Sequence, residues 1–325
     1  MAEAKKTLVS GIKSTGTLHI GNYFGAMRQF LTLQNTYDCN IFVADLHALT
    51  TLQNKEQMQE IIKDTVAGYL AIGLNPEKVT LYKQSDVPEV TELSWILSCL
   101  TTMPYLMRAH AFKDAEAKNK EINVGVFNYP LLMAADILIE QASVVPVGAD
   151  QKQHIEITRD TAQKFNNTFG EVFTLPEALI DEAVQTIPGI DGQKMSKSYG
   201  NIIPLFPTEE VLRKAVMGIT TDSKGVEEAK NPDTDLVFAY HKLFSQNDLE
   251  QLRERYIKGG IGYKESKDIL FENMKNMLLP LRVRFEEIRN DPSLIASVLA
   301  KGGERARGNA ENTIRKVREL VGITM

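Results

Sequence analysis

Cysteine is scarce in this chain of 325 residues, which contains only Cys39 and Cys99. Two cysteines cannot by themselves supply the four ligands of a structural zinc or iron–sulfur site, and an intracellular chain would keep them reduced. No apolar run approaches the roughly 20 residues of a membrane span, and residues 1–6 lack the apolar core of a signal peptide. We therefore expect a cytoplasmic protein that does not enter a membrane.

A strong charge of one sign is lacking as well, since the formal net charge is only −5. Residues 206–325 hold 20 Lys and Arg against 19 Asp and Glu, so the excess acid lies in the remainder of the chain. This balance does not indicate a DNA-binding protein. Local basic patches could still contact RNA, although solvated helix faces explain the same charges equally well. The basic residues concerned are Arg305, Arg307, Arg315, Lys316 and Arg318.

Apolar content is ample for a core, because 43% of the residues are hydrophobic and 24% are charged. Strand-like and helix-like segments alternate over the first part of the chain. We predict strands at 7–11, 40–45, 79–83 and 144–147, and helices at 21–31, 54–73, 91–100, 128–141 and 148–161. Such alternation implies right-handed crossovers and a mostly parallel sheet, so the predicted fold class is α/β, a doubly wound, Rossmann-like domain.

The chain changes character after about residue 205. We predict helical segments at 212–217, 236–243, 249–256, 269–288 and 313–320, with few strand candidates. The predicted organisation is an α/β catalytic domain at 1–205, with a helical insertion near 102–122, followed by an all-helical domain at 206–325 whose last helix could pack back on the first domain. Trp95, the single tryptophan, lies in the amphipathic helix 91–100, and we expect it to pack in the core.

The string Lys194-Met195-Ser196-Lys197-Ser198 is the most distinctive feature of the sequence. Turn-forming Pro, Gly and Asp on either side predict an exposed, mobile loop rather than a helix. Its two ammonium groups and two hydroxyls could hold a phosphate chain as charge develops on it. The alternative is a solvated lysine pair on a surface turn, so the function of the loop depends on whether the rest of the chain builds a nucleotide site.

Two polar clusters follow predicted strands, where a doubly wound sheet binds its ligands. Residues 14–22 lie between the first strand and the first helix, and residues 148–151 open a later helix. Helix amino termini attract phosphate, glycine permits close backbone approach, and His19 can bond a phosphate oxygen. An ordinary surface histidine and an Asp150 that caps a helix are the alternatives.

Asp136 lies inside the apolar helical run 129–138, where a carboxylate is costly unless it is paired or serves a ligand. Met133 is three residues away and so shares nearly the same face. That face could form an apolar slot with one acceptor, which would match an indole group because indole N–H is only a donor. A structural ion pair with Arg or Lys is an equally good explanation.

These motifs together resemble a known family. His19-Ile20-Gly21-Asn22 and the string at 194–198 resemble the two signature motifs of the class I aminoacyl-tRNA synthetases. The stretches 129–136 and 145–154 are similar to the bacterial tryptophan branch of that family. The similarity runs from about residue 10 to residue 198 and continues more diffusely over the helical region.

The resemblance implies an enzyme that activates L-tryptophan with ATP, giving tryptophanyl-adenylate and pyrophosphate, and then transfers tryptophan to the 3′-terminal ribose of tRNA(Trp). It also implies an anticodon-binding role for the helical domain, a homodimer, and Mg²⁺ carried by the ATP phosphates rather than by the protein. The implied catalytic residues are Lys194, Lys197, His19 and Ser196. The implied ATP-binding residues are Lys13, Ser14, Thr15, His19, Gly21, Asn22, Gly148, Ala149, Asp150, Ile187, Lys194, Met195, Ser196, Lys197 and Ser198. The implied tryptophan-binding residues are Asp136, Met133, His47, Gln151, Val9, Val145 and Val147.

Three other functions are weighed against this one. The tyrosine branch of the same family would want more polar partners for a phenol than the run at 129–138 offers. A small-molecule nucleotidyltransferase would not need the long helical region. A non-catalytic RNA-binding relative would not need Lys194 and Lys197, which are both present.

Overall fold

The computed structural model describes residues 5–12, 16–109, 112–113, 116, 122–148, 151–180 and 187–324. The chain forms two compact units. Unit 1 comprises Met1–Gly16, Arg28–Val184 and Asp291–Met325, and unit 2 comprises Thr17–Met27 and Gln185–Asn290. Each unit is therefore built from segments that are distant in the sequence, rather than by a single cut near residue 205.

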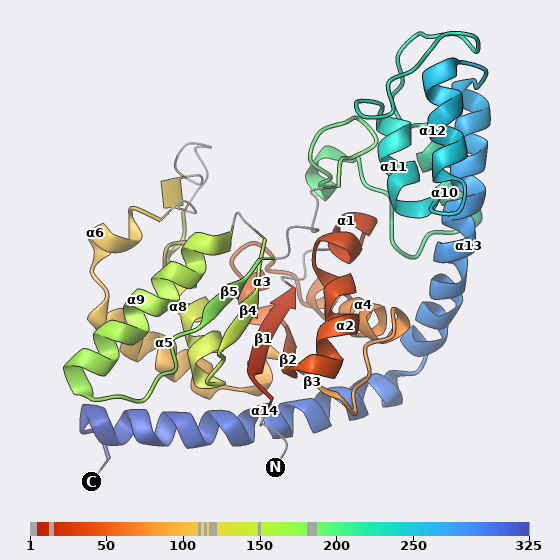
Figure 1. Ribbon diagram of the computed structural model, residues 1–325. Coiled ribbons are helices and arrows are strands. Elements are labelled where there is room, and N and C mark those ends of the chain that lie inside the picture. The colour runs from red at the N-terminus through yellow and green to blue at the C-terminus, as the bar shows by residue number, and fades with distance from the viewer. Residues whose placement is uncertain are drawn as a thin grey trace. The chain divides into compact units, whose positions relative to one another are not determined.

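Unit 1 contains a five-stranded, entirely parallel sheet with the strand order β3-β2-β1-β4-β5 (Figure 1). The strands are β1 (Thr7–Ile12), β2 (Asp38–Val43), β3 (Val79–Lys83), β4 (Val144–Pro146) and β5 (Glu177–Leu179). The order reverses direction between β1 and β4, and the crevice outside the carboxyl ends of strands at such a point is where doubly wound sheets bind ligands. The predicted fold class is confirmed.

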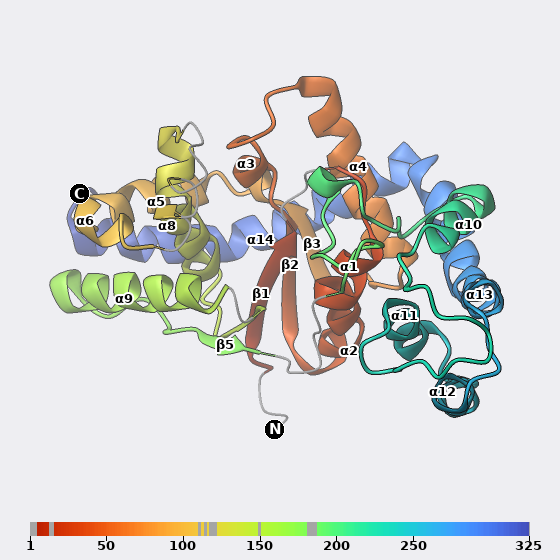
Figure 2. The same ribbon diagram turned by 90° about the horizontal axis from the view of Figure 1, so that it is seen from above.

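Helices flank this sheet. In unit 1 they are α2 (Arg28–Thr36), α3 (Asp45–Ala48), α4 (Lys55–Ala71), the 3₁₀ turn η2 (Gln84–Asp86), α5 (Glu89–Leu100), α6 (Met103–Leu106), α8 (Val124–Ile139), α9 (Lys152–Phe169) and α14 (Pro292–Val321). The predicted cap of α4 is present, because the Asn54 side chain accepts a hydrogen bond from the Gln57 N–H at 2.9 Å. Figure 2 shows α9 beside β5, and α9 packs against both β5 and α8.

The long helix α14 completes unit 1 by packing on β3 and α5 (Figure 1). Its apolar side enters the main core, where Ala306 and Ile314 join Leu97 of α5 and Val145 of β4. The closest approach is at Gly302, where a Cβ atom would lie 1.8 Å from the carbonyl oxygen of Leu81. Only glycine allows the helix and the strand to meet at that distance.

Unit 2 is mainly helical. Its elements are α1 (Ile20–Asn22), the π-helical turn η1 (Tyr23–Met27), the 3₁₀ turn η4 (Lys197–Tyr199), α10 (Glu209–Met217), α11 (Leu236–Phe244), α12 (Leu249–Lys258) and α13 (Tyr263–Arg289). Phe238, Leu252, Tyr256 and Ile261 form an apolar cluster between its helices. Buried His241 lies 2.7 Å from Ser245 Oγ and 3.0 Å from Ser266 Oγ, so polar contacts also join α11 to α13.

Several sequence-based expectations are wrong. Trp95 is 72% exposed on the outer face of α5, because the buried face of that helix is filled by Leu93 and Leu97. The short strand β5 was not predicted, and α14 begins at Pro292 rather than near residue 313. The glycines of α14 made the first half of this helix resemble a loop in the sequence. In the structure, Gly302 is required by the close packing of α14 on β3.

The basic residues near the carboxyl end are largely engaged within unit 1. Arg307 Nε donates to Glu89 Oε1 at 3.0 Å, and Arg318 Nε donates to Glu92 Oε1 at 2.7 Å. The hydrogen bond from Arg318 lowers the pKa of Glu92. Arg307 and Arg318 therefore attach α14 to α5.

Candidate active site

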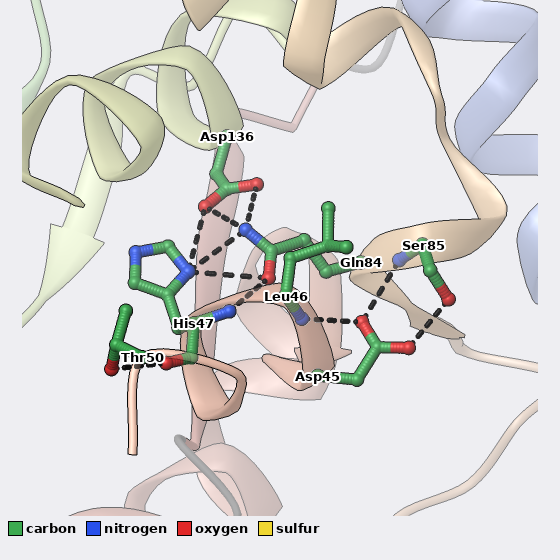
Figure 3. Close-up of polar contacts among 7 residues, drawn as sticks. All are labelled: Asp45, Leu46, His47, Thr50, Gln84, Ser85 and Asp136. Atoms are coloured by element: carbon green, nitrogen blue, oxygen red, sulfur yellow. Dashed lines mark hydrogen bonds and ion pairs between the residues drawn. The ribbon is translucent and has the colours of Figure 1, made fainter. Parts of the chain in front are cut away.

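A buried carboxylate on α8 is the centre of the polar network in unit 1. Asp136 is 3% exposed, and its two carboxylate oxygens accept from Gln84 Nε2 at 2.9 and 2.8 Å. Gln84 is also buried and stands immediately after β3, at the carboxyl end of the sheet. Figure 3 shows the Gln84 amide between Asp136 and His47. Among the described residues the side-chain hydrogen-bond partner of Asp136 is Gln84, rather than the Arg or Lys of the alternative explanation.

His47 of α3 is the third member of this network. Its Nδ1 lies 2.9 Å from Gln84 Nε2 and 3.8 Å from Asp136 Oδ2, and its backbone N–H donates to Gln84 Oε1 at 3.2 Å. Asp45 holds the same turn from the other side, because it accepts from the backbone N–H of Ser85 at 3.0 Å (Figure 3). Helix α3, which carries His47, and the turn η2, which carries Gln84, are therefore fixed to each other.

Burial and neighbouring acids raise the pKa of Asp136 well above its usual value, while the hydrogen bond from Gln84 opposes that shift. The neighbouring acids are Asp45 and Glu140. Glu140 lies one helical turn further along α8, and burial raises its pKa to about 8. A donor that reached Asp136 would favour its charged form and lower its pKa.

Aromatic and apolar groups surround this carboxyl group on α8 and the sheet. The Tyr129 hydroxyl lies 3.0 Å from His154 Nε2, and the Tyr129 ring packs edge-on against the His47 ring, 6.1 Å away. The predicted apolar residues belong to one cluster, in which Val9 and Val145 are buried and Met133 and Val147 are partly buried. Gln151 is half-buried at the start of α9. The predicted amino-acid-binding residues all belong to unit 1.

Several of the predicted ATP-binding residues lie in unit 2, at and near the short helix α1. His19 is 8% exposed, and its Nδ1 has no hydrogen-bond partner among the described residues. Its backbone N–H donates to Asn22 Oδ1 at 3.0 Å. Gly21 makes room for this arrangement, because a Cβ atom there would lie 2.9 Å from His19 Nδ1 and 3.4 Å from Met195 Sδ. His19 therefore presents an unsatisfied ring nitrogen beside the lysine-containing loop.

The string at 194–198 leads into η4, which begins at Lys197, and Ser196 just before it is extended. Lys194 is exposed, Lys197 is half-buried, and Met195 is buried. Burial lowers the pKa of Lys197, and burial together with the Lys197 charge lowers the pKa of His19 to about 4. At neutral pH the imidazole of His19 is therefore uncharged. The loop was predicted to be exposed, and only part of it is.

Some predicted residues fall outside the described part of the chain. They are Lys13, Ser14, Thr15, Ala149 and Asp150. Gly148 is half-buried after β4, where its carbonyl oxygen accepts from the Gln151 N–H at 2.9 Å. Ile187 is 5% exposed, and its carbonyl oxygen accepts from the Met195 N–H. The roles of all the residues implied by the resemblance remain predictions.

Sequence reasoning missed Gln84. Its position just after a predicted strand was the available signal, since side chains at the carboxyl ends of parallel strands face the ligand crevice.

No group of three or more His, Cys, Asp or Glu side chains that could hold a metal occurs in the described ranges. None of the helices described is long and apolar enough to cross a bilayer.

Comparison with known proteins gives one consistent result. Residues 1–279 match the family described as tRNA synthetases class I (W and Y). A tryptophan–tRNA ligase of Fusobacterium nucleatum is 46% identical over 320 residues, 98% of each chain. A tryptophan–tRNA ligase of Rhodopirellula baltica is 44% identical, covering 97% of this chain and 99% of that one. The crystal structure of tryptophanyl-tRNA synthetase from Campylobacter jejuni complexed with ADP and tryptophan matches with a TM-score of 0.91 at 42% identity, covering 97% of this chain and 99% of that one.

The chain belongs to the class I tRNA synthetases that serve tryptophan and tyrosine. Within that family it falls among the tryptophan–tRNA ligases, which are its relatives over nearly their whole length. The resemblance drawn from the motifs at 19–22, 129–136 and 194–198 is confirmed.

Proposed function

We propose that residues of unit 1 select tryptophan and that residues of unit 2 hold the phosphates of ATP. The chain is an aminoacyl-tRNA synthetase, and its activity is the ligation of tryptophan to tRNA. The observation that carries the assignment of roles is the buried Asp136, which is bonded by Gln84 and lies 3.8 Å from His47 Nδ1.

Asp136 would read the indole N–H of tryptophan. Indole can only donate, and a carboxylate oxygen can accept more than one hydrogen bond, so the two groups suit each other. Met133, Val145 and Val147 would contact the flat faces of the ring, with Val9 behind them in the core. His47 and Gln151 would complete the pocket. A phenol, by contrast, both donates and accepts.

Lys194 and Lys197 would hold the leaving pyrophosphate while the tryptophan carboxylate attacks the α-phosphorus in line. The P–O bond to pyrophosphate breaks as the new P–O bond to the carboxylate forms, so no protein nucleophile is needed. His19 would donate to a phosphate oxygen from Nδ1 or Nε2, and Ser196 would contact the same phosphates. The unsatisfied His19 Nδ1 fits this role.

The remaining ATP contacts are proposed on the motifs alone. They involve Gly21, Asn22, Gly148 and Ile187, together with Lys13, Ser14, Thr15, Ala149 and Asp150. Met195 and Ser198 would contribute from the loop. Mg²⁺ would be bound to the ATP phosphates, where it would neutralise charge on the leaving group.

The activated tryptophan would then pass to the 3′-terminal ribose of tRNA(Trp). We assign the anticodon contact to the predicted helical domain at 206–325, and within it to α10–α13, because the basic residues of α14 are largely engaged by unit 1. We also propose a cytoplasmic homodimer that binds neither DNA nor membranes, as the family relationship supports.

Tryptophan-dependent exchange of pyrophosphate into ATP tests this assignment. The wild-type protein should exchange with tryptophan and not with tyrosine or without an amino acid. Lys197→Ala should lower the rate by about 10²–10³, the usual loss when one preorganised donor is removed, with little change in the KM for tryptophan. Exchange at the normal rate in Lys197→Ala would exclude the proposed role of the loop.

A further inference from the structure

Asn201 follows the lysine-containing loop and is 2% exposed. Its Oδ1 accepts from the Ser196 N–H at 2.8 Å, and its Nδ2 donates to the Lys194 carbonyl oxygen at 3.2 Å and to Asp191 Oδ1 at 2.8 Å. A single side chain therefore bonds the backbone on both sides of Met195. Both lysines stand next to these bonds, since Lys194 carries one and Lys197 follows the other.

The same residue closes a short hairpin. The carbonyl oxygen of Asn201 accepts from the Ile190 N–H at 3.0 Å, and the Gly189 N–H donates to the Gln193 carbonyl oxygen at 2.6 Å. Pro188 pairs with Lys194 across the hairpin in an antiparallel bridge. The loop is thus an organised structure whose two arms are joined through Asn201.

Gly189 shows how closely this side chain is packed. A Cβ atom at residue 189 would lie 2.2 Å from Asn201 Nδ2 and 2.4 Å from its Cγ. Any other residue at this position would push the Asn201 amide away from its three partners. The hairpin therefore depends on a glycine opposite the asparagine.

We propose that Asn201 is a positioning residue for tryptophan activation, which places the Lys194 and Lys197 ammonium groups on the phosphates by fixing the backbone between them. The proposal rests on the proposed function of these lysines. It is distinct from that function, because Asn201 touches the loop backbone and need not touch ATP. A displacement of about 1 Å in a reacting geometry can lower a rate about 10²-fold.

Asn201→Ala tests the proposal in the full-length protein. The kcat of tryptophan-dependent ATP–pyrophosphate exchange should fall about 10²-fold, in proportion to the expected misplacement. The KM for tryptophan should stay within about twofold, because Asn201 bonds none of the residues around Asp136. Asn247→Ala is the matched control, since Asn247 is exposed in the same unit and should give wild-type rates.

A rescue separates positioning from simple loss of structure. Asn201→Asp sets two carboxylates against each other at residues 191 and 201, so it should be as slow as Asn201→Ala. Adding Asp191→Asn reverses donor and acceptor: the new amide can donate to the carboxylate at 201, which still accepts from the Ser196 N–H. The double variant should have a kcat about tenfold higher than that of Asn201→Asp. Such a gain requires that the hydrogen bond between the side chains at 191 and 201 contributes to catalysis.

Gly189→Ala is the second route to the same change, since it displaces the asparagine without altering it. It should lower kcat as Asn201→Ala does, and combining the two should cost little more than either alone. The proposal is overturned if Asn201→Ala and Gly189→Ala exchange at near-wild-type rates while Lys197→Ala does not. If Lys197→Ala itself is fully active, the proposed function of the loop fails first, and the positioning role fails with it.

Discussion

Gln84 and Asp136 are joined by a bifurcated contact in which one amide nitrogen lies 2.9 and 2.8 Å from the two oxygens of one carboxylate. The two residues come from η2 and α8 and are both buried. Because the amide also contacts His47 Nδ1 at 2.9 Å, it fixes the direction of the carboxylate. An acceptor that is fixed in this way can discriminate between ligands.

Gln84→Met should weaken tryptophan binding. The substitution keeps the volume but removes the donor, and leaving a buried group without its partner costs roughly 1–3 kcal/mol. We expect the KM for tryptophan to rise about 10- to 100-fold, while the KM for ATP is unchanged. Gln163→Met on α9 is the control, since Gln163 bonds only the exposed Asn167 at 2.9 Å. Equal KM values for the two variants would show that Gln84 does not orient Asp136.

Asp136→Ala should abolish the preference for tryptophan over phenylalanine. A site built to bond a substrate N–H rejects analogues without it by about 10⁴–10⁵, and most of that ratio should be lost. The measurement is the ratio of kcat/KM for the two amino acids in pyrophosphate exchange. Glu140→Gln is a matched control on the same helix, because Glu140 has its pKa raised to about 8 and so is already mostly neutral at pH 7. Glu140→Gln should keep the wild-type ratio of kcat/KM for tryptophan to kcat/KM for phenylalanine.

His241 should make unit 2 sensitive to acid. Burial lowers its pKa from the ordinary value of 6.5 to about 4, so the folded state favours the neutral ring. The resulting stabilisation is complete above pH 6.5 and is lost as the pH falls towards 4, by roughly 3 kcal/mol in all. Urea denaturation of His241→Gln should show a shallower loss of unfolding free energy over this range than wild type. Parallel curves for the two proteins would contradict the assignment.

Gly302→Ala should destabilise unit 1. The added methyl group would lie 1.8 Å from the Leu81 carbonyl oxygen and force α14 away from β3; such overpacking typically costs about 1–3 kcal/mol. Gly308→Ala on the same helix meets nothing within 4 Å and should be neutral or stabilising by about 0.5–1 kcal/mol. Thermal unfolding of both variants measures the difference. Similar melting temperatures would mean that α14 does not depend on this contact.

Local patterns account for what could be predicted of the fold. Apolar runs with turn residues at either end gave β1 and β3, and the spacing of Asn54 and Gln57 gave the start of α4. The short strand β5 was not recognisable, because its three residues pair with β4 only in the folded sheet. Trp95 was misplaced for a related reason: periodicity identifies an apolar stripe but does not show which of its large residues has a neighbour.

The candidate site was predictable where motifs are contiguous and not where the fold assembles it. His19, Asp136 and Lys197 stood out through their local surroundings in the sequence. Gln84 did not, because its partner is 52 residues away and a lone glutamine after a strand has no distinguishing chemistry. The same is true of Asn201, whose meaning depends on three partners that only the hairpin brings together.

The packing of α14 also constrains how this chain folds during synthesis. The core of unit 1 includes Ala306, Ala310, Ile314 and Val317, so this core is incomplete until the ribosome has made them. Residues 185–290, which form most of unit 2, are made in the interval. At about 5–20 residues per second this interval lasts on the order of 10 s. Unit 1 should therefore complete its folding only after nearly all of the chain has been synthesised, and a nascent chain stalled before α14 should be the form most open to proteases and chaperones.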